Sequence, residues 1–208
     1  MTSRNPLIEV HAYPRSSRAS RGRQGAAGFT MLELLISLLI VLLGVLGLAG
    51  LIARSNQAEM ESYQRVQALM LAQDMADRIN ANRKVAACYS NGATGVQLGT
   101  AGTGYTGTPA CAAGTTQQNA RAVADLTAWH NLLTGSAEVL SASNVGAMIG
   151  ARGCINQISA ATQTYIVSVV WQGLAATAAP ANTCGQNLYG NDNLRRVVTV
   201  TFRIATLS

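Results

Sequence analysis

Three residues near the start of a long apolar stretch carry the chemistry that this sequence offers. Gly28 precedes Phe29, and Glu33 is the only charged residue between Phe29 and Ala53. A residue without a side chain lets the backbone enter a narrow protease cleft, which makes the bond after Gly28 a candidate cleavage site. Cleavage there would give Phe29 a free ammonium group.

The Glu33 carboxylate needs a partner if its helix enters lipid. An ionised carboxylate in a membrane helix costs on the order of 2.5–3.5 kcal/mol on insertion scales. The simplest solution is that Glu33 of an incoming subunit pairs with the Phe29 amine of a neighbour, so that both charges are neutralised only on assembly. The alternative is a Glu33 side chain at the membrane interface that reaches water.

The apolar stretch itself predicts a membrane helix. Residues 34–53 carry no charge, and about 20 such residues in a helix span a ~30 Å hydrocarbon core. No proline occurs from Phe29 to Arg83, so we predict one helix from about 29 to 83, with 29–53 in the membrane. An ordinary secretory signal is the competing interpretation, but its apolar core is shorter and ends at small residues.

The net charge of +6 is concentrated ahead of this helix. Residues 1–28 hold five arginines and one glutamate, a net charge of +4. Positive charge before an apolar run keeps the N-terminus cytoplasmic, so 1–28 is predicted to be a cytoplasmic leader. The remainder is nearly neutral and has no basic cluster, so we expect no nucleic-acid partner.

After residue 53 the sequence predicts a soluble domain, 54–208. Apolar residues recur at mostly three- or four-residue steps, which predicts an amphipathic helix with this face on the domain: Met60, Tyr63, Val66, Met70, Ala76 and Ile79. A short helix is expected at 120–133, strands at 164–171 and 197–204, and loops at 90–118 and 173–193. A helix first and strands last predict an α+β fold with a small antiparallel sheet packed on the long helix.

Four cysteines follow the apolar segment: Cys88, Cys111, Cys154 and Cys184. In an oxidising compartment they are expected to form disulfides. Three pairings are possible, and we favour the sequential one because each bridge then closes a short Gly/Asn-rich segment. No pair has zinc-finger spacing, so no metal is predicted.

The sequence offers no arrangement typical of an enzyme. His130 is the only histidine after the apolar segment, and its spacing from Asp125 does not place the two well on one helix face. Arg195 and Arg196, at the start of the last strand, are expected to be solvated. We therefore predict no catalytic activity and no cofactor.

Gly28-Phe29, Glu33 and the apolar helix together resemble the processing signal of type IV pilins and pseudopilins. Residues 63–82 (YQRVQALMLAQDMADRINAN) are similar to the helix of the PilV-type minor pilins, also called type IV pilus modification proteins. Asp125 with Trp129, and the strand 169–171, fit that family too. The similarity is dense over 28–83 and sparse beyond.

The resemblance implies a type IV pilin-like fold and a low-abundance structural subunit. A prepilin peptidase would cut after Gly28 and methylate the Phe29 amine. The mature chain would cross the inner membrane once, with 54–208 periplasmic, and join other minor pilins and the major pilin in the pilus or at its tip. Two alternatives are a minor pseudopilin of a type II secretion system, and a periplasmic binding domain that uses the helix only as an anchor.

Overall fold

The computed structural model describes residues 28–101, 104–136, 139–141, 143–144 and 148–205. The predicted leader, except for Gly28, lies outside the described residues. The chain divides into two compact units, residues 1–48 and 49–208. One helix, α1 (Met31–Ala81), supplies residues to both units and passes through Gly44, Gly47 and Gly50 without a break.

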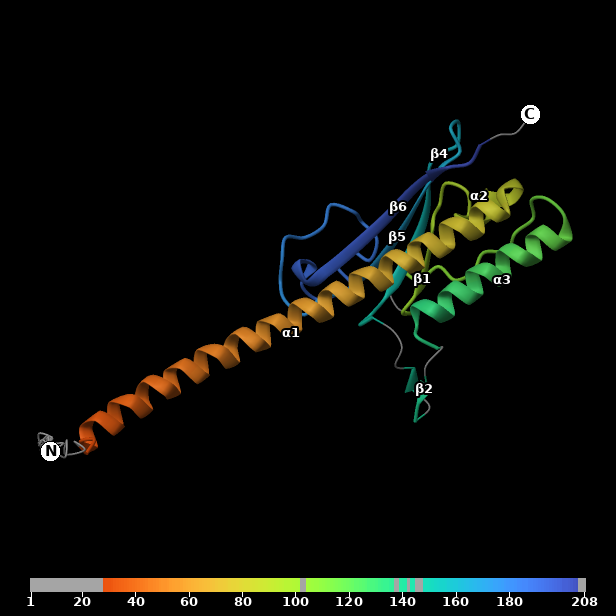
Figure 1. The fold of residues 1–208 in the computed structure, drawn as a ribbon. Helices are drawn as coiled ribbons and strands as arrows, with labels where there is room; N and C mark the ends of the chain where they lie inside the picture. Colours follow the sequence, from red (N-terminus) through yellow and green to blue (C-terminus); the bar gives the residue numbers. More distant parts are fainter. Residues whose placement is uncertain (1–27, 102–103, 137–138, 142, 145–147, 206–208) are drawn as a thin grey trace, which may run out of the picture. The chain divides into compact units, whose positions relative to one another are not determined.

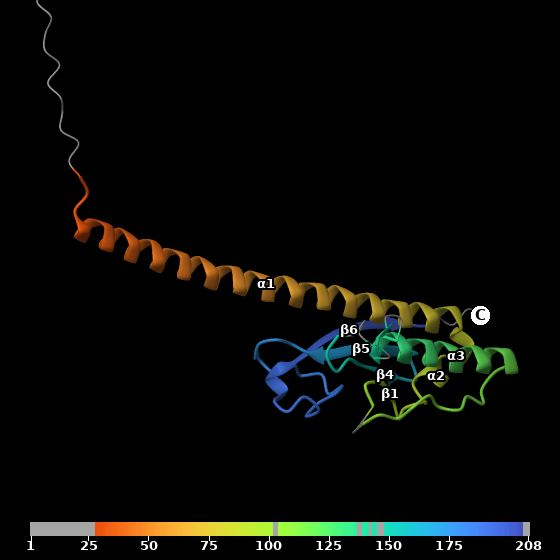
Figure 2. The ribbon, with the colours of Figure 1, turned by 90° about the horizontal axis from the view of Figure 1, so that it is seen from below.

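A four-stranded antiparallel sheet forms the centre of the second unit. Beyond α1 the elements are η1 (Arg83–Val85), α2 (Ala86–Tyr89), β1 (Val96–Gly99), α3 (Thr116–Leu133), β2 (Val139–Leu140), β3 (Ser143–Asn144), β4 (Arg152–Ser159), β5 (Thr164–Gln172), η2 (Asp192–Leu194) and β6 (Arg195–Arg203). The sheet order is β1-β4-β5-β6, and β2 and β3 form a separate small hairpin. Figure 1 shows the second half of α1 beside α3 on this sheet, and Figure 2 gives the view turned by 90°.

The register of the sheet separates its two faces. Gly153 of β4 lies opposite Val169 of β5, which in turn lies opposite Val198 of β6. Because side chains alternate along a strand, these residues share one face, and that face packs on α1 and α3. Cys154, Val170 and Val197 are next to these residues on their strands and point to the opposite face. The segment 173–194 covers that face, and its residues Cys184, Leu188 and Tyr189 form a second apolar cluster with them.

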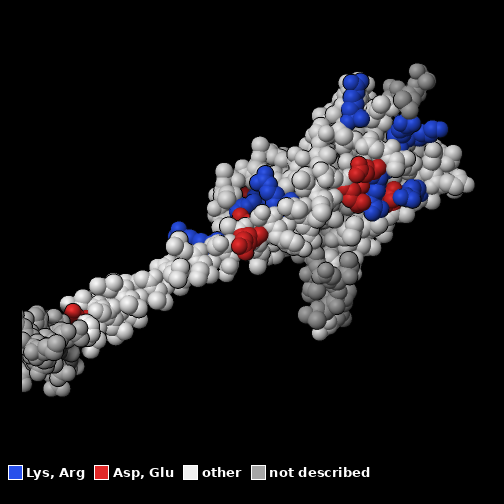
Figure 3. Space-filling model, viewed as in Figure 1, with Lys and Arg blue, Asp and Glu red and all other residues white. Residues whose placement is uncertain are grey.

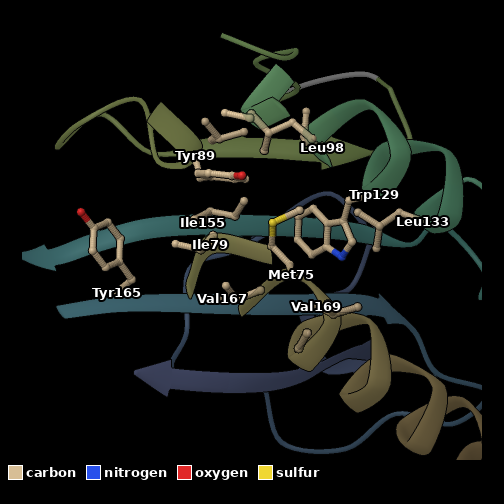
Figure 4. Close-up of a cluster of buried hydrophobic side chains, with 14 of the residues drawn as sticks. Met75, Ile79, Tyr89, Leu98, Trp129, Leu133, Ile155, Tyr165, Val167 and Val169 are labelled. Atoms are coloured by element: carbon tan, nitrogen blue, oxygen red, sulfur yellow. The ribbon is translucent and has the colours of Figure 1, made fainter. Parts of the chain in front are cut away.

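Small residues on α1 bring the helix close to the sheet. Ala68 and Ala72 are fully buried, and Met75 and Ile79 complete the same face. Figure 4 shows Met75 and Ile79 among the side chains of the sheet and of α3. The indole nitrogen of Trp129 in α3 donates a hydrogen bond to the Leu71 carbonyl oxygen at 2.9 Å, which ties the two helices together.

The structure confirms the α+β class but corrects the predicted core face of α1. Ala76 and Ile79 are buried as expected, whereas Met60, Tyr63, Val66 and Met70 are exposed. The helix therefore has two apolar stripes, and its alanine-rich stripe packs on the sheet. Larger side chains would hold the helix farther from the strands.

Two strands of the four-stranded sheet, and the small β2–β3 pair, were missing from the sequence prediction. β1 lies inside the segment 90–118 that was expected to be a loop, and β4 was not predicted. β4 contains Gly153, whose added Cβ would lie 2.2 Å from the Trp129 ring, so the glycine is needed for packing. α3 also begins earlier than expected, because Thr115 and Gln118 form a capping box at its start.

Candidate functional site

The start of α1 presents the three residues singled out in the sequence on one exposed stretch. Gly28 and Phe29 precede the helix, and Phe29 is 77% exposed. Thr30 caps the helix, because its hydroxyl oxygen accepts a hydrogen bond from the Glu33 N–H at 3.2 Å. Phe29 therefore lies outside the helical hydrogen-bond ladder, and the bond after Gly28 is open to approach from solvent.

The Glu33 side chain has no partner among the described residues. Glu33 is exposed, and its backbone carbonyl accepts a hydrogen bond from the Ser37 hydroxyl at 2.7 Å. A carboxylate in the first turn interacts favourably with the positive end of the helix dipole. That interaction still leaves the carboxylate oxygens available to a cation from outside the helix.

An apolar surface follows Glu33 along α1. Every residue from Met31 to Met60 is exposed, and the side chains from Leu34 to Ala53 carry no charge. Figure 3 shows acidic atoms near the start of the helix, followed by an uncharged surface. Within the described residues, α1 is the one helix that is long and apolar enough to cross a membrane.

Two disulfides brace the second unit. Cys88 is bonded to Cys111, and Cys154 is bonded to Cys184, which is the sequential pairing that we favoured from the sequence. The first ties α2 to the segment before α3, and the second ties β4 to the segment 173–194. The described residues contain no group of three His, Cys, Asp or Glu side chains placed to hold a metal ion.

Asp125 is the buried centre of a polar cluster. Its carboxylate accepts hydrogen bonds from Arg78 of α1 at 3.2 Å, from Arg121 at 3.0 Å and from the Tyr89 hydroxyl at 2.8 Å. Burial, together with the hydrogen bond to Asp125, raises the pKa of Tyr89. The cluster joins α1, α2 and α3. Of these contacts, the sequence could have predicted the Arg121–Asp125 ion pair, because residues four apart lie on the same face of a helix.

Arg195 corrects a second expectation. It was predicted to be solvated, but its side chain is fully buried. It pairs with Asp192 through Nε–Oδ1 at 2.7 Å and Nη2–Oδ2 at 2.8 Å. It also donates to the carbonyl oxygens of Pro180, Asn182 and Cys184, so one guanidinium holds the covering segment on the sheet.

His130 does not meet Asp125. Its Nδ1 accepts a hydrogen bond from the Gly99 N–H at 3.1 Å, and its ring lies beside Tyr105. The imidazole therefore joins α3 to β1. Asp125 is engaged by Arg78, Arg121 and Tyr89, so it does not orient His130. The contact of His130 with Gly99 is a structural one.

Comparisons with known proteins agree with the arrangement at the start of α1. Residues 50–127 match the family model described as type IV pilin Tt1218, and residues 23–49 match the model of the prokaryotic N-terminal methylation motif. No curated protein and no solved structure matches the chain. The long helix on a small antiparallel sheet is consistent with the type IV pilin fold. The chain therefore carries a segment that matches a type IV pilin model directly behind a segment that matches the prokaryotic N-terminal methylation motif.

Proposed function

We propose that the protein is a minor subunit of a type IV pilus, anchored in the inner membrane before it enters the filament. The observation that carries the proposal is the start of α1, where Gly28, Phe29 and Glu33 lie inside the matched methylation motif. An exposed apolar helix surface follows directly, and such a surface needs lipid or other helices to cover it.

Processing is proposed to occur between Gly28 and Phe29. A prepilin peptidase would remove the leader 1–28 and methylate the new Phe29 amine. The segment 29–53 would then span the membrane and later lie in the filament core, with 54–208 on the periplasmic side. The exposed position of Phe29 ahead of the Thr30 cap supports access of the peptidase.

Glu33 is proposed to direct assembly through its charge. A free amine at Phe29 and the unpaired Glu33 carboxylate are both costly in lipid, and pairing between neighbouring subunits removes both costs together. Such a pair acts mainly on register and entry into the filament. It leaves the fold of 54–208 untouched, because the Glu33 side chain is exposed and has no partner among the described residues.

The minor rather than the major role rests on the likeness of residues 63–82 to the PilV-type minor pilins. In this role the protein would act with other minor pilins to prime pilus assembly and would remain in the pilus or at its tip. A minor pseudopilin of a type II secretion system would share the processing and the apolar helix. Its partners would differ, and partner identity therefore separates the two. Neither role requires a catalytic site.

The test combines the mass of the mature protein with a charge variant. We expect intact-mass measurement to find a chain that begins at N-methylated Phe29. Glu33→Ala should be cleaved normally but be at least about tenfold depleted from sheared pili, whereas Glu59→Ala, an exposed glutamate further along α1, should enter pili normally. A retained leader, or a start near residue 51, would contradict the prepilin assignment. Normal entry of Glu33→Ala into pili would refute the charge-pair argument.

A further inference from the structure

A small pocket opens on the face of the sheet that α1 and α3 do not cover. It has a volume of about 230 Å³ and lies within the second unit. Gln97 of β1 and Cys154 of β4, which are cross-strand partners, contribute to its lining, and Asn156 follows on β4. We call this feature the β1–β4 pocket.

Both walls of the β1–β4 pocket are held by bonds within the fold. On one side Thr106 is fixed to the backbone of Gln97, because its N–H donates to the Gln97 carbonyl oxygen at 3.0 Å and its hydroxyl oxygen accepts from the Gln97 N–H at 2.7 Å. On the other side Cys184 is bonded to Cys154, and its carbonyl oxygen accepts from Arg195 at 3.0 Å. The walls are therefore in place before any ligand binds.

The carboxamide of Gln97 has no hydrogen-bond partner. Its Nε2 atom is buried and unpaired. The Cys154 sulfur lies 3.7 Å from its Oε1 atom, but a disulfide sulfur has no proton to donate. Gly104 leaves room beside the amide, because an added Cβ there would lie 2.9 Å from Nε2. The fold thus keeps a polar side chain unpaired at a cost in stability, although an apolar side chain of the same length would avoid that cost.

The other polar groups of the pocket are also available and carry no charge. The carboxamide of Asn156 and the hydroxyls of Thr94 and Thr183 form no hydrogen bond with the described residues. Among the described residues, none that lines the pocket is charged. Because the terminal torsion of a glutamine side chain is broad and roughly two-fold, Gln97 can turn either its oxygen or its nitrogen toward the pocket. The pocket therefore offers both donors and acceptors to a neutral ligand.

We propose that the β1–β4 pocket binds one ring of a neutral sugar, with the carboxamides of Gln97 and Asn156 hydrogen-bonded to its hydroxyls. Each sugar hydroxyl both donates and accepts, and the hydroxyls around a ring point in several directions, as the polar groups from β1, β4 and the two walls do. A single peptide carboxamide would satisfy only one of these groups. The volume lies below the range of about 300–1,000 Å³ that drug-sized ligands occupy, which suits one ring. This inference goes beyond the proposed function and does not depend on it.

The test is saturation-transfer-difference NMR on the full chain, in a detergent without a sugar headgroup. The probes are glucose, galactose, mannose and N-acetylglucosamine, each added separately. We expect at least one of them to bind with a Kd on the order of 1 mM, the range for so small a ligand. Gln97→Met keeps the length of the side chain without its amide and should weaken that binding at least about fivefold. Gln117→Met is the matched control, because Gln117 is exposed on α3 and lies outside the pocket.

Thermal unfolding separates loss of a binding group from loss of the fold. Replacing an unpaired Gln97 amide breaks no hydrogen bond, so Gln97→Met should melt no lower than the unmodified protein. If Gln97→Met does not fold, Asn156→Ala decides, since Asn156 is exposed and its truncation should still weaken sugar binding.

Three results would overturn the inference. The first is that none of the four sugars binds. The second is an affinity that the folded Gln97→Met, or Asn156→Ala in its place, leaves unchanged. The third is displacement of the bound sugar by N-acetylasparagine amide at an equal or lower concentration, which would make the pocket a site for a peptide side chain.

Discussion

Replacement of Arg195 by methionine tests how the segment 173–194 is held on the sheet. The substitution keeps a long apolar stem but removes the guanidinium. Asp192 then loses its partner, and the carbonyl oxygens of Pro180, Asn182 and Cys184 lose their donor. The perturbation is therefore confined to one side chain that serves four acceptors.

The magnitude follows from burial. Arg195 is fully buried, whereas the Asp192 side chain is 19% exposed and can recover some hydration. Breaking a buried ion pair by removing one partner costs about 3–5 kcal/mol, and a buried acceptor left without a donor costs about 1–3 kcal/mol. The terms do not add fully, because the segment can shift toward water. We expect Arg195→Met to lower the free energy of unfolding by about 3–5 kcal/mol.

The free energy of unfolding of Arg195→Lys should fall between that of the unmodified protein and that of Arg195→Met. A lysine ammonium has three donors on one nitrogen and cannot reproduce the planar fork that reaches Asp192 and three carbonyls together. Arg203→Met is the matched control, since Arg203 lies on the same strand, is exposed, and makes one hydrogen bond to the Thr162 carbonyl oxygen. It should cost less than about 1 kcal/mol.

The assay is urea unfolding of the detergent-solubilised full chain, followed by the fluorescence of the two tryptophans, both of which are buried. Limited proteolysis should in parallel show faster cleavage within residues 173–194 for Arg195→Met. If Arg195→Met proves no less stable than Arg203→Met, the guanidinium does not hold this segment and the argument from burial is wrong.

Two further predictions concern the same unit. Gly153→Ala should destabilise the fold by about 1–3 kcal/mol, because the new methyl group would overlap the Trp129 ring; urea unfolding measures the loss, and an unchanged midpoint would contradict the close packing. The hydrogen bond from Arg195 holds the pKa of the Asp192 carboxyl below its usual value of 3.8. The ionised form is thereby favoured in the folded state, so its contribution is present above that value and is lost as the pH falls through the lowered pKa. The difference in melting temperature between the unmodified protein and Asp192→Asn should therefore be largest near neutral pH and shrink in strong acid, and a difference that does not vary with pH would contradict the pairing.

The sequence predicts the long helix and the last two strands well, for physical reasons. No proline interrupts α1, so its ends at Met31 and Ala81 lie within two residues of the expected bounds. The strands β5 and β6 are rich in β-branched residues, and their bounds lie close to those expected. β4 was not predicted because glycine and polar residues interrupt the alternation of apolar and polar side chains along it. The reason for Gly153, its packing against α3, is visible only in the structure.

Long-range partners explain the remaining errors. The stripe that contains Met60 and Tyr63 is more hydrophobic than the alanine stripe, yet the sheet requires close approach and selects the alanines. Likewise, Arg195 is buried because backbone carbonyl groups of a loop accept its hydrogen bonds. Every residue has such a carbonyl group, so the sequence does not show which ones will meet the arginine. For Gly28, Phe29 and Glu33 the structure adds exposure and the Thr30 cap, while cleavage and charge pairing remain predictions.

The contacts of α1 with the end of the sheet have a consequence for biosynthesis. Gln64 meets a tryptophan 107 residues later in the chain, and Glu61 meets an arginine 135 residues later. At about 5–20 residues per second, 135 residues take roughly 7–27 s to synthesise. During that time the alanine stripe of α1 is made but the sheet on which it packs is still incomplete. A newly made chain therefore depends on whatever shields this stripe until β6 has been translated, and a nonsense mutation before β6 should lead to degradation of the whole subunit.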